Sequence, residues 1–496
     1  MYNISMLQRI LTTKNIFLLI IFSIFLFTSS LYINRVPGLM GDEGDEGQNI
    51  SELLTNKKPP LVGERSYIGA WIDYVRMPFV FVFGYNAFAL RLVTLIFSAS
   101  LFGLAYKVLT HQFGEIGGLM GLSAVAFSPI YFAEQRMSWA ITLLPFFVIL
   151  TIYFYQQKKK WSALLMGFAA GLGANTHILF LAVLAGIIIT AIPITILKLS
   201  RNFSKEYLKK VALGALMATV GFWASFGIQY ANLVLYKSDQ GNAEKNARYF
   251  TNRLVELPRL APRFISGSVY AAHYTSHLFT DTFNRYIWLS LSVLIIAGII
   301  LSKKRTTIIA WIFGTAVYLL VLLFMIEYYA LRYFSVVTLS IWLLAGVGLG
   351  SIFDRYKLRK AGYSLSIILC LLLMLFNFQT ILIPFTKTGG STDNFQILGE
   401  KYGNASDLVD FRPLVSCIEN LDNVFSNNIN IRNRLHFLAN GNKLIKIAPG
   451  KYDVKWLIQY REPNSQLKPS EVCPDLLHFA VTPTTDNSRE VEWPKD

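Results

Sequence analysis

Four carboxylates lie within five residues in the segment Gly41-Asp42-Glu43-Gly44-Asp45-Glu46-Gly47. Carboxylates packed this closely repel one another and need a metal ion, basic side chains or a proton held by a raised pKa. Such a cluster suits a general base or a metal ligand, and it equally suits a solvated acidic turn at a helix end. We take Asp42, Glu43 and Asp45 as candidate catalytic residues and keep the acidic-turn interpretation open.

The composition indicates the environment of this acidic cluster. The chain has 496 residues, of which 53% are hydrophobic and only 15% are charged. A soluble domain carries roughly 25% charged residues, so the composition predicts an integral membrane protein in a lipid bilayer. The net charge of +16 comes from short basic clusters between apolar runs, where topology signals belong, and we therefore expect no nucleic-acid partner.

Eleven apolar segments have a length suited to crossing the hydrocarbon core, which requires roughly 20 residues. The expected fold class is an all-α polytopic membrane protein with about 11 transmembrane helices. The fifth and sixth segments share a short turn and predict a tight or partly re-entrant hairpin. The segments are residues 15–33, 86–107, 115–132, 138–155, 161–176, 178–198, 211–236, 285–302, 306–326, 334–353 and 361–383.

The basic loops predict the orientation. With the N-terminus in the cytoplasm, all four basic clusters fall on the inner side, as the positive-inside rule requires. The protein is then expected in the inner (plasma) membrane, with the acidic cluster and any active site outside the cytoplasm. The four clusters are residues 158–160, 198–210, 303–305 and 355–360.

Three long polar segments share the opposite side: the outer loops 34–85 and 237–284, and the tail 384–496. The tail follows a membrane domain of residues 1–383. Its mixed polarity, its Asn/Gly turns and its strand-like stretch predict a small extracytoplasmic α+β domain. Cys417 and Cys473 lie in it and can pair in an oxidising compartment.

Four motifs in order along residues 35–350 resemble the GT-C superfamily of glycosyltransferases. Within it, the resemblance is to the protein O-mannosyltransferase and lipid A aminoarabinose transferase branch. The motifs are the acidic pair after the first span with Phe83-Gly84-Tyr85-Asn86-Ala87-Phe88-Ala89-Leu90-Arg91, then Ser128-Pro129 with Glu134-Gln135-Arg136, then Gly167 to His177, and last Glu327-Tyr328-Tyr329-Ala330-Leu331-Arg332-Tyr333.

The resemblance implies an enzyme that moves a monosaccharide from a polyprenyl-phosphate donor to an extracytoplasmic acceptor, by a single inverting displacement. The family places the first acidic residue of the outer loop as the base, which favours Asp42 over Asp45, with Glu43 beside it. Arg136 and Arg332 lie on the outer side near the membrane and match family positions, so they are candidates to hold the leaving phosphate; each is alternatively an anchor at a helix end. We expect no other cofactor than a possible divalent metal ion, its ligands unknown.

The remaining candidates have two interpretations each. Glu134 is either a second carboxylate of the site or the partner of Arg136 on the same turn. His177 stands where many family members have lysine, and it either binds phosphate or metal or is an interfacial histidine.

Further substrate-binding candidates are Tyr333, which follows Arg332, and the outer-loop pair Lys57 and Lys58. Arg91 is expected to be structural, through a pair with an acidic residue of the first loop.

The expected acceptor is a surface glycan, such as lipopolysaccharide or its O-antigen, rather than a protein. An O-antigen polymerase or ligase is the first alternative, because Arg248, Arg253, Arg259 and Arg263 make the second outer loop basic. A lipid or glycan transporter (a flippase) is the second. The near absence of charge at the span centres disfavours it.

Overall fold

Apolar helices make up the body of the protein in the computed structural model. The residues that it describes are 13–34, 41–56, 67–157, 159, 161–201, 204–235, 243–268, 280–326 and 331–382, and, toward the C-terminus, 412–418, 421, 424–426, 435, 437–438, 450–453, 456–460, 473, 479–483 and 488–491.

Each of the eleven apolar segments forms helix, because hydrocarbon leaves a backbone no other way to satisfy its hydrogen bonds within one segment. Within the described residues, six helices are long and apolar enough to cross a membrane, and four further apolar helices are shorter. The helices are α2 (Thr13–Ser30), α5 (Ala87–Phe113), α6 (Glu115–Ala126) with α7 (Pro129–Glu134), η1 (Ala140–Leu143) with α8 (Leu144–Gln156), α9 (Ser162–Thr176), α10 (Phe180–Arg201), α11 (Lys205–Leu235), α13 (Asp281–Leu301), α14 (Arg305–Met325), η5 (Leu331–Phe334) with α15 (Ser335–Arg355), and α16 (Arg359–Asn377) with the π-helical turn η6 (Phe378–Leu382).

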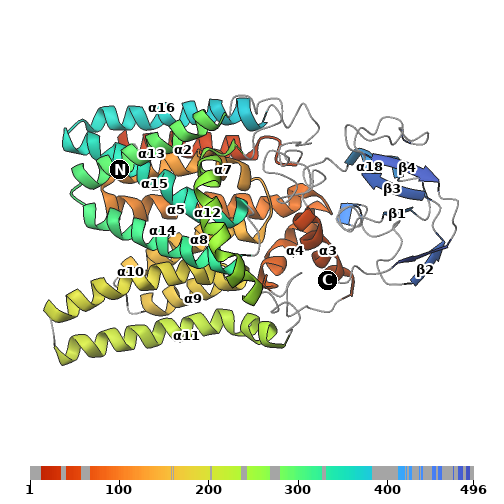
Figure 1. The fold of residues 1–496 in the computed structure, drawn as a ribbon, viewed down its shortest axis with the longest axis horizontal. Coiled ribbons are helices and arrows are strands. Elements are labelled where there is room, and N and C mark those ends of the chain that lie inside the picture. The colour runs from red at the N-terminus through yellow and green to blue at the C-terminus, as the bar shows by residue number, and fades with distance from the viewer. Residues whose placement is uncertain are drawn as a thin grey trace, which may run out of the picture.

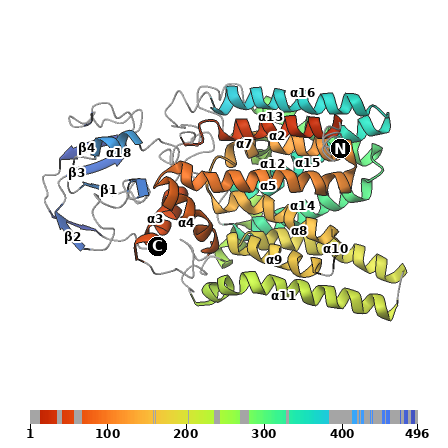
Figure 2. The same ribbon diagram turned by 180° about the vertical axis from the view of Figure 1, so that it is seen from behind.

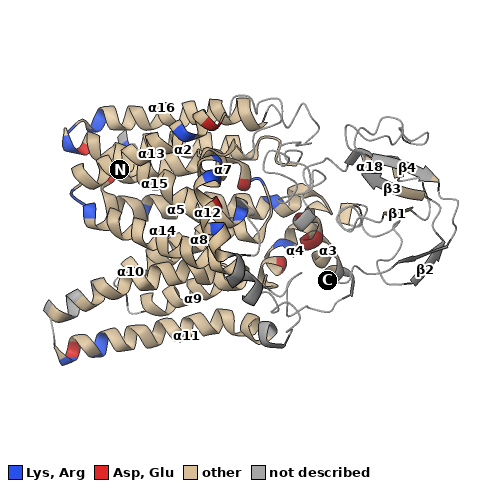
Figure 3. Ribbon diagram, viewed as in Figure 1, with Lys and Arg blue, Asp and Glu red and all other residues tan. Residues whose placement is uncertain are grey.

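These helices lie side by side along the long axis of the molecule (Figure 1). Two helices of the first outer loop, α3 (Gly41–Asn56) and α4 (Trp71–Phe83), cover one end of the bundle. The second outer loop contains α12 (Ala243–Ser266), which runs across the bundle. The loops that join α13 to α14 and α15 to α16 carry basic residues and lie at the end away from α3 (Figure 3). Which side of the membrane each end faces stays a prediction.

Small residues bring the central helices together. A side chain at Gly346 of α15 would begin 2.5 Å from the Met120 carbonyl oxygen of α6. At Gly350 it would begin 2.6 Å from the Cα atom of Gly117. Helices that pack in lipid gain contacts by such close backbone approach, because the hydrophobic effect does not drive them together. The core therefore has α6 and α15 in direct backbone contact.

The described residues from 412 onward form a short helix and two small sheets beyond α3 and α4 (Figure 2). We call residues 412–491 the C-terminal segment. Its strands pair as β1–β3 parallel (Phe425 opposite Leu457), β3–β4 antiparallel and β2–β5 antiparallel. The elements are α18 (Arg412–Ile418), β1 (Val424–Ser426), β2 (Gly450–Asp453), β3 (Trp456–Tyr460), β4 (Phe479–Pro483) and β5 (Ser488–Val491).

A disulfide joins Cys417 of α18 to Cys473, as expected for a segment in an oxidising compartment. The predicted domain boundary at residues 383–384 falls outside the described residues and stays a prediction.

Candidate active site

The acidic cluster lies in the first turns of α3. Negative side chains stabilise this end of a helix, because its N–H groups give it a partial positive charge. Ile50 and Leu53 follow at helical spacing and are buried. The segment is therefore an amphipathic helix that lies on the end of the bundle, and not a solvated turn.

Glu43 is held by a buried ion pair with Arg91 of α5. Its Oε1 accepts a hydrogen bond from Arg91 Nε (2.9 Å) and its Oε2 accepts one from the terminal guanidinium nitrogen (2.6 Å). The Ser138 backbone N–H also donates to Oε1 (2.5 Å), and both charged side chains are fully buried. Arg91 is therefore structural, as predicted. The same contacts argue against Glu43 as a catalytic base, because both of its oxygens are occupied.

Glu46 makes a second buried pair, with Arg76 of α4. Its Oε1 accepts the Ala140 N–H (3.2 Å), and Arg76 donates to the Ser138 carbonyl (2.7 Å). Two glutamates one helical turn apart thus bind α3 to the backbone of residues 138–140. For Glu43 and Glu46, the arginine partners therefore offset the repulsion within the acidic cluster.

Asp45 lies on a different face of α3 from the two glutamates. It directly precedes Glu46, and successive helical residues are about 100° apart around the axis. We call the face that carries Asp45 the aspartate face. Asp45 is buried, with 7% of its surface exposed, whereas the side chain of Asp42 is outside the description. Because the glutamates fix the rotation of α3, they also fix the direction of this aspartate face.

Asp73 of α4 is a third buried carboxylate of the outer loop. Asn49 donates to its Oδ2 (2.7 Å), and Arg76 lies 3.9 Å from its Oδ1. Burial raises the pKa of Asp73 to about 6, and the nearby Arg76 charge and the Asn49 hydrogen bond reduce this effect. The sequence analysis missed this residue, although the Asp73–Arg76 spacing on an otherwise apolar helix was a visible signal.

Arg136 makes contacts that its predicted role in phosphate binding does not explain. Its guanidinium is fully buried and donates to the carbonyls of Thr28 and Leu31 at the end of α2. Burial, and secondarily the positive charge of Arg91, lowers the pKa of Arg136 to about 9. Arg136 thus closes the last turn of α2, and these contacts argue against its assignment to phosphate binding.

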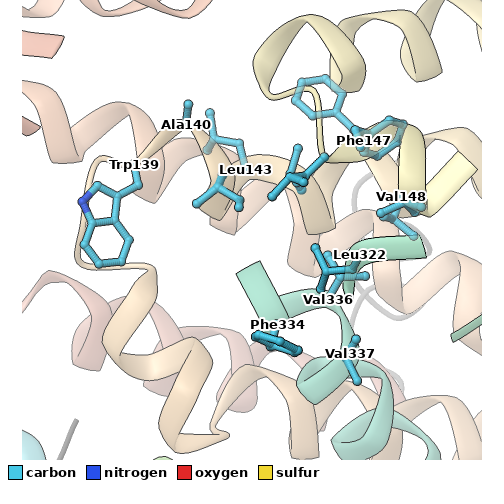
Figure 4. Packing of buried hydrophobic residues seen from close by; sticks show 14 of the residues in the cluster. Trp139, Ala140, Leu143, Phe147, Val148, Leu322, Phe334, Val336 and Val337 are labelled. Carbon is cyan, nitrogen blue, oxygen red and sulfur yellow. The ribbon is translucent and has the colours of Figure 1, made fainter. Parts of the chain in front are cut away.

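Arg332 has a different environment. Its guanidinium lies over the ring of Trp139 (5.1 Å) and over that of the adjacent Tyr333 (5.5 Å), and the side chain is partly exposed. Trp139 is on the segment that receives α3, between the residues bound by Glu43 and Glu46. Figure 4 shows Trp139 and Ala140 at the head of a buried apolar cluster that Phe334 completes from η5. Arg332 and α3 therefore contact the same short segment, Arg332 through the Trp139 ring and α3 through the backbone N–H groups of Ser138 and Ala140.

His177 makes ring contacts with Tyr333, the residue that follows Arg332, and with Tyr67 of the outer loop. Its ring is 6.3 Å from that of Tyr333 and 5.3 Å from that of Tyr67. The turn between α9 and α10 is bound to the outer loop, since Gly69 N–H donates to the Asn175 carbonyl (2.7 Å) and Ile178 N–H to that of Tyr67 (3.0 Å). The predicted hairpin of the fifth and sixth segments thus has its turn at the candidate site.

Glu134 ends α7 and is buried. Near the same end of the bundle, the Tyr318 hydroxyl donates to the Tyr333 carbonyl of η5 (2.9 Å). Both interpretations of Glu134, as a second carboxylate of the site and as the partner of Arg136, stay predictions.

Polar atoms without hydrogen-bond partners also gather in residues 135–139. Within the described part of the chain, Gln135 Nε2 and Oε1 and Trp139 Nε1 are buried and have none. Buried polar groups are nearly always paired, so such atoms mark places for a polar ligand or an ordered water. Neither residue was singled out for the site from the sequence.

Two predicted residues cannot be placed. Lys57 and Lys58 lie outside the described residues. The described residues contain no group of three or more His, Cys, Asp or Glu side chains that would hold a metal ion.

Comparisons with known proteins identify the fold. No protein-family model matches the sequence, and no curated protein does. The structure is similar to ArnT from Cupriavidus metallidurans in the apo state, with a TM-score of 0.52 and 11% identity over 86% of this chain and 84% of that chain. ArnT bound to undecaprenyl phosphate matches with a TM-score of 0.50 and 11% identity over 85% and 84%.

An oligosaccharyltransferase from Archaeoglobus fulgidus, in complex with zinc and sulfate, matches with a TM-score of 0.46 and 12% identity over 86% of this chain and 62% of that chain. ArnT is a member of the GT-C superfamily. The predicted resemblance to this superfamily is therefore confirmed at the level of the fold.

Proposed function

We propose that this GT-C-fold protein is a membrane glycosyltransferase that moves a monosaccharide from a polyprenyl-phosphate donor to an acceptor outside the cytoplasm. The proposal includes eleven membrane spans, a cytoplasmic N-terminus and a C-terminal α+β domain on the outer side of the inner (plasma) membrane. A polyprenyl phosphate unites a long apolar chain with a phosphate at the membrane surface. An enzyme for it needs lipid-facing helices and a charged site at one end of them.

One observation carries the proposal. The helix α3 is fixed to residues 138–140 by two buried glutamate–arginine pairs and their hydrogen bonds to the backbone, which orient its aspartate face. The same residues contact Arg332 through Trp139. In this proposal the carboxylate base of α3 and the guanidinium of Arg332 are both held against residues 138–140, which supports their action on one substrate.

The proposed reaction is a single displacement. The aspartate of α3, Asp42 in the first instance and Asp45 as its neighbour, takes the proton of the acceptor hydroxyl. The acceptor oxygen forms a bond to the anomeric carbon while the bond from that carbon to the phosphate oxygen breaks. The phosphate leaves with the electron pair, the configuration inverts, and Arg332 stabilises the developing negative charge.

Other residues have supporting roles in this proposal. Glu134 and Tyr333 border the donor site, with His177 beside them, and Gln135 and Trp139 supply hydrogen bonds to sugar hydroxyls. Arg136 and Glu43 position the backbone.

A divalent cation would draw on Asp42, Asp45 or Glu134.

We propose a surface glycan, such as lipopolysaccharide or its O-antigen, as the acceptor. The polymerase alternative rested on the arginines of the second outer loop. Two of them have structural contacts: Arg253 donates to the Leu323 carbonyl (3.0 Å), and Arg263 pairs with Asp281 (2.8 Å). This reduces the number of arginines in that loop that are available to a polymer.

The test compares the surface glycans of cells that express wild type, Asp42→Asn or Asp45→Asn, with membrane levels measured by immunoblot. We expect one aspartate variant to be present at the normal level and to lose one type of sugar from the glycan. Leu213→Ala, at a position exposed on α11, is the matched control and should leave the glycan unchanged. If both aspartate variants keep every glycan and glycoprotein as in wild type, the catalytic assignment is wrong, and a transporter becomes the better hypothesis.

A further inference from the structure

Phe437 of the C-terminal segment is fully buried, although it belongs to a cluster separate from that segment's own core. It packs in a cluster with Ile50 of α3 and Val80 of α4, together with the first turn of α5. The Tyr85 ring lies edge-on to it at 5.8 Å. An aromatic side chain from the far end of the chain thus fills the junction of the three elements that carry the candidate site.

The contact with α3 is made at Gly47. A Cβ atom at this position would lie 2.7 Å from Phe437 Cδ2 and 2.8 Å from Cγ, so the ring lies directly on the helix backbone. Glycine in a helix interior costs roughly 0.5–1 kcal/mol relative to alanine. The close approach of the ring gives a reason for it, since any side chain would displace Phe437. Gly47 directly follows Glu46, which binds Arg76.

The other side of the contact is anchored. Leu438 packs both in this cluster and against the core of the C-terminal segment, which includes Leu435, Ile458 and Cys473. The Cys417–Cys473 disulfide crosses that core and joins α18 to the strand region. A cross-linked core is therefore connected to α3 through two adjacent side chains, Phe437 and Leu438.

We propose that Phe437 is a positioning residue, through which the C-terminal segment presses α3 against residues 138–140 and sets the direction of its aspartate face. The glutamate pairs hold one side of α3, and the Phe437 ring holds the adjacent side at Gly47. This inference rests on the proposed function for its catalytic consequence, but the contact itself does not. A displacement of about 1 Å in such a site lowers the rate by about 100-fold.

The contact is tested without any enzyme assay. The double variant Gly47→Cys/Phe437→Cys, made in full-length protein in membranes, should form a new disulfide on mild oxidation, seen as a mobility shift that reductant reverses. Cys370 is buried in the bundle and stays unreacted. The pair Phe81→Cys/Phe437→Cys is the control, because Phe81 is 78% exposed on α4. Equal cross-linking of both pairs, or none of the first, would overturn the contact.

The positioning role is tested by a mutant cycle in purified protein. Phe437→Ala should lower kcat by about 10- to 100-fold with a smaller change in KM. Phe437→Leu, which keeps a large apolar side chain, should retain most of the wild-type kcat. Gly47→Ala should lower kcat too, and the double variant Gly47→Ala/Phe437→Ala should be less impaired than the product of the single effects, because the added methyl group then has room.

Phe81→Ala should match wild type. If wild type transfers sugar and Phe437→Ala has the same kcat, the positioning role is wrong while the proposed function stands. If wild type transfers no sugar but the cysteine pair cross-links, the function fails and the contact stands.

Discussion

The candidate site contains arginines in two different environments. Arg91 and Arg76 form buried ion pairs, whereas Arg332 lies on aromatic rings. The first two are completely buried, and carboxylates of α3 neutralise them at hydrogen-bond distance. Arg332 lies on aromatic rings and keeps part of its surface exposed. A guanidinium matched by a buried carboxylate can only hold structure, whereas one on an aromatic face retains its affinity for an incoming anion.

The largest effect is expected when a matched pair is broken. Arg91→Ala leaves the Glu43 carboxylate buried without its counter-charge, and we expect a loss of about 3–5 kcal/mol in unfolding free energy. The measurement is thermal or denaturant unfolding in detergent, with membrane level as a second readout. Arg263→Ala is the control, because its pair with Asp281 is partly exposed and should contribute less than about 1 kcal/mol. Similar losses in both variants would mean that burial of the pair is not what matters.

A smaller effect is expected from the pH dependence that Asp73 imposes. Its folded-state pKa of about 6 exceeds the usual 3.8, so the folded state binds the extra proton between these values. Stability should therefore fall as the pH rises from about 4 to about 6, by about 3 kcal/mol in total. In Asp73→Asn this slope should disappear from unfolding measured across that range. The control is Glu206→Gln, at an exposed position, which should keep the pH dependence of stability. If the pH dependence persists in Asp73→Asn and is lost in Glu206→Gln, Asp73 is not its source.

The smallest effect concerns the aromatic-stacked arginine. Arg332→Lys keeps the charge but loses the planar contact with Trp139 and Tyr333, and we expect about a 10-fold fall in kcat/KM for the lipid-linked donor. For Arg332→Met, which also removes the charge, kcat/KM should fall by about 100-fold. Both should unfold as wild type does. If Arg332→Met unfolds earlier but transfers sugar at the normal rate, the two arginine environments do not differ in function.

The sequence predicted those features that depend on short stretches of chain. Each apolar segment became helix because length and hydrophobicity decide that locally. The pair of Arg91 with a first-loop carboxylate was also predicted, although not that Glu43 would be the partner. The link from Cys417 to Cys473 followed from there being two cysteines in one tail.

The sequence did not reveal contacts that only the assembled bundle creates. Arg136 follows Glu134 on one turn, which suggested a pair or a phosphate site, yet the end of α2 lies beside it and takes its hydrogen bonds. Glu43 had the same chemistry as Asp45, and only the position of α5 separates their roles. Phe437 gave no signal, because its partners Gly47 and Ile50 lie nearly 400 residues earlier.

The contacts that hold α3 also set an order for its biogenesis. Glu43 is separated from Arg91 by 48 residues and from the Ser138 N–H by 95. At about 5–20 residues per second, the ribosome adds the last of these partners some 5–20 s after Glu43. Until residues 138–140 are synthesised, Glu43 and Glu46 have only their arginine partners, and α3 lacks the backbone groups that receive it. The outer loop is therefore expected to reach its final packing only after the chain has passed residue 140.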